Sequence, residues 1–156
     1  MTPNVQNRKL KRFVLLALGR LSVSFAALER VRGAPMAPRL HFARELCEPI
    51  LAGHKRATTR LDGESDPNSD LHALSAGVEA QAVTGPAGAP ETFARLRVDR
   101  VDALTVGEID DALAREEGCA HAAELVRLLK RLYPDATATT NLSGFRFTLQ
   151  EDQSRG

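Results

Sequence analysis

Residues 50–60 read ILAGHKRATTR and carry the clearest structural signal in this chain. The stretch begins at the end of an amphipathic segment, passes through Gly53 and continues into a threonine-containing run that is typical of a strand. Three cations and two adjacent hydroxyl groups lie within residues 53–60. A lysine three residues before a threonine can act as a base for a weak hydroxyl nucleophile, or it can bind phosphate. The local sequence leaves both alternatives open.

The segments around this stretch predict a short helix between two strands. The helix ends at Gly53 and should direct Leu46, Ile50 and Leu51 towards the core. The expected elements are a strand over residues 39–43, the helix over 45–52 and an extended segment over 57–61.

Side-chain alternation within the extended segment has a consequence for the two threonines. Successive residues of a strand point to opposite faces, so Thr58 and Arg60 should share one face and Thr59 should lie on the other.

The rest of the chain predicts a small mixed domain. The spacing of Thr105 and Glu108 is that of a capping box, which predicts a helix from there to about Glu117, with Gly118 as its stop. The other expected elements are an exposed loop over residues 62–70, strands over 78–84 and 93–101, a hairpin loop over 85–90, a helix from 122 to 133 and a closing strand over 145–149. The order β-α-β-β-β-α-α-β predicts an α+β fold with a curved or barrel-like mixed sheet and short helices at its rim.

Length and composition fit one globular domain. The chain has 156 residues, 43% of them hydrophobic, and no apolar run long enough to span a membrane. Its two cysteines, Cys47 and Cys119, lie far apart and form no disulfide framework, which fits a reducing compartment. We therefore expect a cytoplasmic protein that makes no membrane contact.

Charge is distributed unevenly. Residues 1–39 carry eight Lys/Arg and one acid, a net charge of +7, whereas residues 40–156 carry thirteen Lys/Arg and nineteen acids, a net charge of −6. We interpret residues 1–38 as a basic extension: a targeting segment, a disordered arm, or an over-called start with translation beginning at Met36. The domain itself is expected over 39–149, followed by a polar tail over 150–156.

The pattern G-x-K-x-x-T-x-R in residues 53–60, with Glu117-Gly118, Tyr133-Pro134 and the closing strand in the same order downstream, resembles an ASCH domain. The resemblance covers about residues 39–149. It implies a PUA-like β-barrel and a function linked to RNA or to modified nucleosides.

Within that family the chain is most similar to small bacterial amidohydrolases that remove the acetyl group from N(4)-acetylcytidine. By position, the resemblance implies Lys55 as proton acceptor, Thr58 as nucleophile and Glu117 as proton donor. Neighbouring residues would bind the nucleoside or RNA; these are His54, Arg56, Thr59 and Arg60. We expect neither a cofactor nor a metal, because Cys119 and His121 lack a second pair of ligands.

Two alternatives remain from the sequence. In the first, the chain is a non-catalytic RNA-binding module in which Arg56, Arg60 and Arg95 or Arg97 bind phosphate. In the second, it is a ribonuclease that uses the same cationic cleft. Each candidate also has a structural interpretation: Lys55 and Arg56 as a solvated turn, Glu117 as a surface acid, or Arg60 paired with a loop acid such as Asp62.

Overall fold

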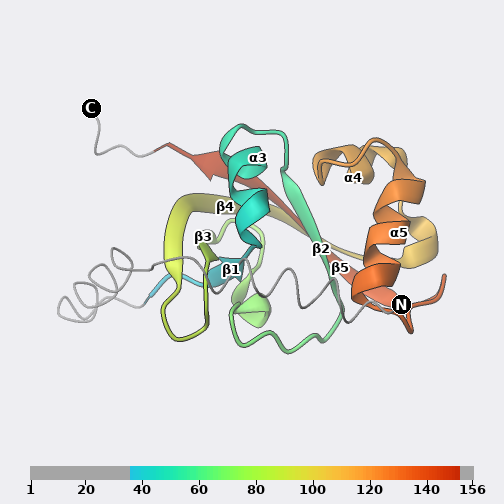
Figure 1. Ribbon diagram of the computed structural model, residues 1–156, viewed down its shortest axis with the longest axis horizontal. Helices are drawn as coiled ribbons and strands as arrows, with labels where there is room; N and C mark the ends of the chain where they lie inside the picture. The colour runs from blue at the N-terminus through green and yellow to red at the C-terminus, as the bar shows by residue number, and fades with distance from the viewer. Residues whose placement is uncertain (1–35, 152–156) are drawn as a thin grey trace.

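The computed structural model describes residues 36–151. The extension expected over residues 1–38 therefore lies largely outside the described residues, as does the end of the expected tail. The order β-α-β-β-β-α-α-β is confirmed (Figure 1). The elements are β1 (Arg39–His41), α3 (Cys47–Leu51), β2 (Ala57–Leu61), β3 (Glu79–Thr84), β4 (Glu91–Thr105), α4 (Asp111–Glu116), α5 (Ala122–Leu132) and β5 (Asn141–Gln150), with 3-10 turns at Arg44–Leu46, Leu71–Ala73 and Val106–Glu108.

The five strands form one curled mixed sheet in the order β1-β3-β4-β5-β2. β1 runs parallel to β3, and the other neighbours are antiparallel. The β4–β5 register shifts between Val98 and Arg100, and such bulges bend a strand and increase its twist. The curl brings the two edge strands within reach of one side chain, since Arg60 of β2 donates from Nη2 to the His41 carbonyl of β1 at 2.5 Å. The sheet is a curled half-barrel with short helices, which confirms the predicted α+β class and is consistent with the predicted PUA-like β-barrel.

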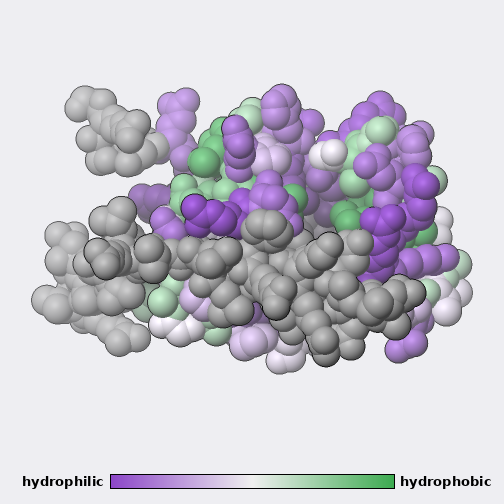
Figure 2. Space-filling view, viewed as in Figure 1, coloured by the Kyte–Doolittle hydropathy of each residue, from purple (hydrophilic) through white to green (hydrophobic). Residues whose placement is uncertain are grey.

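Two hydrophobic clusters flank this sheet. The first fills the space between the sheet and α3, and its buried members are Leu40, Phe42, Ile50, Leu74, Ala80, Ala82, Leu96, Val98, Phe145 and Phe147. The second attaches α4 and α5, which lie together at one end of the sheet (Figure 1), and consists of Ala57, Val106, Ile109, Leu113, Ala114, Leu125, Leu129 and Leu142. The described surface over α5 is largely hydrophilic in Figure 2, as expected for a helix with one apolar face.

Three details differ from the sequence prediction. The capping box of Thr105 and Glu108 is present, but it begins only a 3-10 turn; α4 starts later with its own cap, Asp110, whose side chain accepts from Leu113 N at 2.8 Å. β4 and β5 are longer than predicted, because each extends the pairing of the other as far as Thr105 opposite Asn141. Leu51 was expected in the core but is 50% exposed.

The ends of the helices follow the prediction. Gly118 has a φ of +89°, the left-handed conformation expected after a helix C-terminus, and Gly53 has a φ of +80° after α3. Both cysteines are free thiols. Within residues 36–151, no helix is both long and apolar enough to cross a membrane.

Candidate functional site

A buried ion pair between Lys55 and Glu117 joins two distant segments of the chain. Lys55 lies in the turn that follows α3. This turn is held by two hydrogen bonds, from His54 N and Lys55 N to the Pro49 carbonyl, at 2.9 and 3.1 Å. Glu117 is the C-cap of α4. Lys55 Nζ and Glu117 Oε1 are 3.5 Å apart, and each side chain is only 7% exposed. These two residues were predicted to act together, and the fold places them in contact.

Lys55 has protein acceptors around its amino group. Nζ donates to the carbonyls of Ala57 and Glu117 at 2.8 and 3.3 Å, in addition to the Glu117 carboxylate. Burial lowers the pKa of Lys55, and the nearby Glu117 carboxylate opposes that shift. A lysine in this setting loses its proton more readily than one in water. Because the side chain is buried, the interpretation of Lys55 as part of a solvated turn is wrong.

The Glu117 carboxylate is held by Thr59. Thr59 N donates to Oε1 at 3.0 Å, and Thr59 Oγ1 donates to Oε2 at 2.7 Å. Both oxygens are therefore fixed by one residue of β2, which ties the end of α4 to the sheet. Glu117 is not the surface acid of the structural interpretation.

Thr58 lies on the opposite face of β2, as the alternation predicted. It is 5% exposed, and its Oγ1 accepts a hydrogen bond from Arg60 Nε at 3.3 Å. Arg60 continues to Asp66 Oδ2 at 3.4 Å and to the His41 carbonyl. The fold thus brings Lys55 and Glu117 together with Thr59, while Thr58 belongs to a second polar cluster with Arg60.

The loop over residues 62–70 covers this second cluster. Asp66 pairs with Arg60 in place of the expected Asp62, and Ser69 Oγ accepts from His41 N at 2.9 Å. Ser69 is buried, so the prediction of an exposed loop is wrong for this part of it. Asp66, Ser69 and Asp70 of this loop bond to the edge strands, whereas Asp62, Ser65 and Pro67 remain exposed.

Tyr133 and Glu64 connect the same loop to α5. The Tyr133 hydroxyl donates to Glu64 Oε2 at 2.9 Å. Burial, together with the nearby Glu64 carboxylate, raises the pKa of Tyr133. The sequence did not predict these two contacts. Tyr133 and Glu64 are 69 positions apart, and Arg60 and Asp66 are separated by the turn of the loop, so neither pair gives a local signal.

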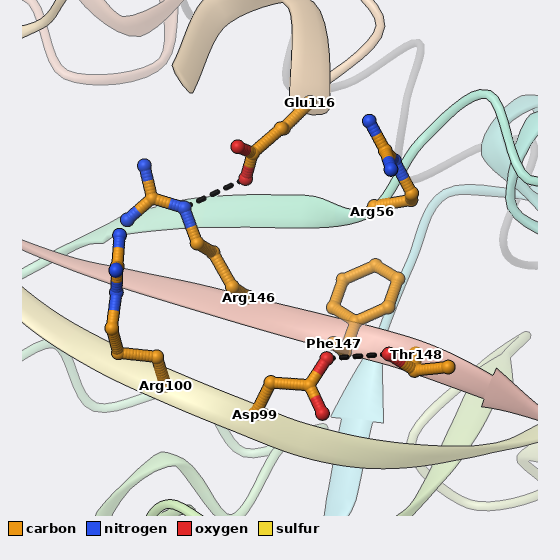
Figure 3. Close-up of a pocket in the computed structure, with 7 residues that line it drawn as sticks. All are labelled: Arg56, Asp99, Arg100, Glu116, Arg146, Phe147 and Thr148. Carbon is orange, nitrogen blue, oxygen red and sulfur yellow. Dashed lines mark hydrogen bonds and ion pairs between the residues drawn. The ribbon is translucent and has the colours of Figure 1, made fainter. Parts of the chain in front are cut away.

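A pocket of about 390 Å³ lies between β4, β5, the end of α4 and the turn before β2 (Figure 3). Its lining residues are Arg56, Asp99, Arg100, Glu116, Arg146, Phe147 and Thr148. Of the residues predicted to bind nucleoside or RNA, only Arg56 lines this pocket. His54 is exposed and lies in the turn before Arg56. Arg146 and Thr148 had no signal in the sequence beyond their place in the closing strand.

Solved structures of other proteins share this architecture. A DUF984-family protein from Enterococcus faecalis V583 has a TM-score of 0.56 at 15% identity, over 83% of this chain and 91% of that one. An ASCH domain from Lactobacillus crispatus JV V101 has a TM-score of 0.57 at 16% identity, over 71% of this chain and 77% of that one. The fold is that of an ASCH domain. No protein-family model and no curated protein matches the chain by sequence.

The shared ASCH fold agrees with the resemblance of the sequence motifs. The lysine, the two threonines and Glu117 come from segments that this fold brings together: the turn before β2, β2 itself and the end of α4. No group of three His, Cys, Asp or Glu side chains within the described part of the chain is arranged to hold a metal ion.

Proposed function

We propose that this chain binds a nucleoside or an unpaired RNA base and hydrolyses the amide of N(4)-acetylcytidine. The observation that supports the proposal is the buried Lys55–Glu117 pair, which the Thr59 hydroxyl also joins, with Thr58 next to it on the other face of β2. Buried ionisable pairs of this kind are costly to desolvate and are concentrated at functional sites.

The pair contains the base and the acid that the reaction needs. A buried lysine and glutamate can share a single proton, as an ammonium with a carboxylate or as an amine with a carboxylic acid. Burial lowers the pKa of Lys55, which is the direction that a general base needs. The resemblance implies Lys55 as the proton acceptor and Glu117 as the proton donor, and the proposal assigns them these roles once substrate is bound.

Thr58 is the better nucleophile of the two threonines. The Thr59 hydroxyl proton is already donated to Glu117, whereas the hydrogen bond of Thr58 Oγ1 within residues 36–151 is one that it accepts, from Arg60. A neighbouring guanidinium also stabilises an alkoxide. Lys55 does not contact Thr58 in this structure, so the proposal requires its amine to turn towards Thr58 when substrate binds; catalytic hydrogen bonds often tighten only in the complex.

The reaction then proceeds through an acyl-threonine. Thr58 Oγ1 bonds to the acetyl carbonyl carbon while its proton passes to the Lys55 amine. The C–N bond breaks as Glu117 gives its proton to the exocyclic nitrogen, and cytidine leaves. Water then attacks the threonine ester, giving a proton to Glu117; Lys55 returns its proton to Thr58 as acetic acid departs.

The test measures cytidine release from N(4)-acetylcytidine by the full chain and by isosteric variants. Thr58→Val and Lys55→Met should each lower the rate by at least about 10²-fold, the typical contribution of general-base and nucleophilic groups. Arg127→Gln on the exposed face of α5 serves as a control and should have no effect. Full activity in a folded Thr58→Val protein, or no release by the folded wild-type chain, would overturn the proposal.

A non-catalytic RNA-binding function, or ribonuclease action at the same surface, is the second candidate. It is supported by the three arginines that line the pocket. Arg95 and Arg97, the other predicted phosphate contacts, are engaged by Glu79 and Asp99. RNA binding through several phosphates would weaken steeply with salt, because each contact releases counterions, whereas binding of an uncharged nucleoside would not.

A further inference from the structure

The pocket lined by Arg56, Glu116 and Arg146 carries charges that the proposed hydrolysis does not use. Figure 3 shows the side chains of Arg100 and Arg146 on one side and that of Arg56 on the other, with Glu116 between them and Asp99 below. A pocket for a purely apolar or purely anionic ligand would not combine these groups. The combination fits a molecule with both an anion and hydroxyl donors.

Two of the three arginines already have acidic partners. Arg146 Nε donates to Glu116 Oε2 at 2.7 Å, and its Nη1 contacts Asp102. Arg100 Nε donates to the same Asp102 carboxylate at 2.8 Å. These pairs fix the two guanidinium planes and leave part of their donor groups directed elsewhere.

Arg56 differs from the other two arginines. Its guanidinium is exposed, and no side-chain partner for it occurs among residues 36–151. Its backbone is nevertheless fixed, because Arg56 N donates to the Glu116 carbonyl at 2.6 Å and Arg56 O accepts from Phe147 N at 2.9 Å. An anion in the pocket would therefore find one uncommitted guanidinium on a firmly held backbone.

The opposite wall offers groups suited to hydroxyls. Asp99 accepts from the Thr148 hydroxyl at 2.5 Å and from Arg97 Nε at 3.0 Å, and carboxylate oxygens have further lone pairs for additional donors. Thr148 Oγ1 can itself accept a hydrogen bond. Vicinal hydroxyls of a sugar match this wall.

The pocket and the ion pair share the same two chain segments. Arg56 and Glu116 line the pocket, while the residues next to them, Lys55 and Glu117, form the pair. Two residues that line the pocket are therefore chain neighbours of groups that the proposed hydrolysis uses.

We propose that this pocket binds the ribose 5′-phosphate of a nucleotide, with Arg56 on the phosphate and Asp99 and Thr148 on the sugar. The inference rests on the proposed function and narrows it, since the substrate becomes a phosphorylated cytidine instead of the free nucleoside. The phosphate belongs either to a mononucleotide or to an RNA strand.

Calorimetry with unacetylated ligands tests the pocket without requiring catalysis. The full chain should bind cytidine 5′-monophosphate at least about tenfold more tightly than cytidine, the effect of one charge-assisted hydrogen bond. Arg56→Gln should reduce this preference to about twofold or less, while Arg127→Gln should leave it unchanged. A short single-stranded cytidine RNA distinguishes the two phosphate sources: markedly tighter binding than the monophosphate indicates RNA.

The outcomes separate this inference from the proposed hydrolysis. Equal affinities for cytidine and its monophosphate, with acetyl release still observed, would overturn the phosphate site and leave the hydrolase intact. A phosphate preference that depends on Arg56, without acetyl release from nucleoside or nucleotide, would support the pocket and refute the hydrolase. A preference that Arg56→Gln does not alter would also overturn the assignment.

Discussion

The two adjacent threonines of β2 allow stability and catalysis to be separated by single isosteric changes. Thr59→Val removes the 2.7 Å hydrogen bond from Oγ1 to Glu117 Oε2, and Thr58→Val removes only the 3.3 Å bond from Arg60. The first bond joins a hydroxyl to a buried carboxylate, and such charge-assisted bonds contribute about 1.5–3 kcal/mol to stability. The second leaves an arginine with two other partners, so its loss should cost about 0.5–1.5 kcal/mol.

We therefore expect opposite orders in two assays. In urea denaturation Thr59→Val should be the less stable variant. In thermal denaturation its melting temperature should be about 4 °C lower for each kcal/mol lost in a chain of this size. In the acetylcytidine assay Thr58→Val should be the less active, because it lacks the nucleophile. If Thr59→Val abolished turnover while the folded Thr58→Val protein retained it, the assignment of Thr58 as nucleophile would be wrong.

Further predictions concern the ion pair, acid stability and the second hydrophobic cluster. Glu117→Gln should destabilise the protein by about 3–5 kcal/mol, because it leaves Lys55 buried without its counter-charge; adding Lys55→Met should recover part of the loss in a double-mutant cycle. The Arg39 side chain, hydrogen-bonded to Asp70, holds the pKa of that carboxyl below its ordinary value of 3.8. The stability that this pair contributes is fully present above the unfolded-state pKa of 3.8 and is lost as the pH falls through the lower folded-state pKa. Asp70→Asn should therefore flatten the acid side of a curve of stability against pH, measured by urea denaturation. Leu125→Ala on α5 should cost about 2–5 kcal/mol in the same measurement, because the side chain is 1% exposed in the second cluster; a loss below 1 kcal/mol would show that α5 contributes little to the core.

Elements whose signals are local were predictable from the sequence. The apolar spacing from Ala122 to Leu132, ended by Pro134, gave the observed helix because a 3.6-residue period is a property of neighbouring residues. Gly118 marked the end of α4 for the same reason. The lengths of β4 and β5 could not be predicted, since a strand ends where its partner stops pairing, and that partner lies elsewhere in the chain.

In the candidate site, too, some features could be predicted from the sequence and others depend on contacts between distant segments. The motif placed Lys55 and Glu117 in one site although 62 residues separate them, and the structure joins them. The motif does not show that Thr59, rather than Thr58, holds the carboxylate, or that Asp66 rather than Asp62 meets Arg60. These choices depend on how the ends of α4 and the 62–70 loop pack against β2.

By itself, the sequence determined the succession of elements, the faces of β2 and the residue types available for chemistry, because each depends on periodicity and on side-chain identity within a few positions. Only the tertiary structure decided which of these groups are buried together. The exclusion of water from Lys55 and Glu117, and the open pocket at Arg56, arise where the curled sheet meets the C-terminus of α4. Burial and proximity are properties of contacts between distant segments, and no local pattern encodes them.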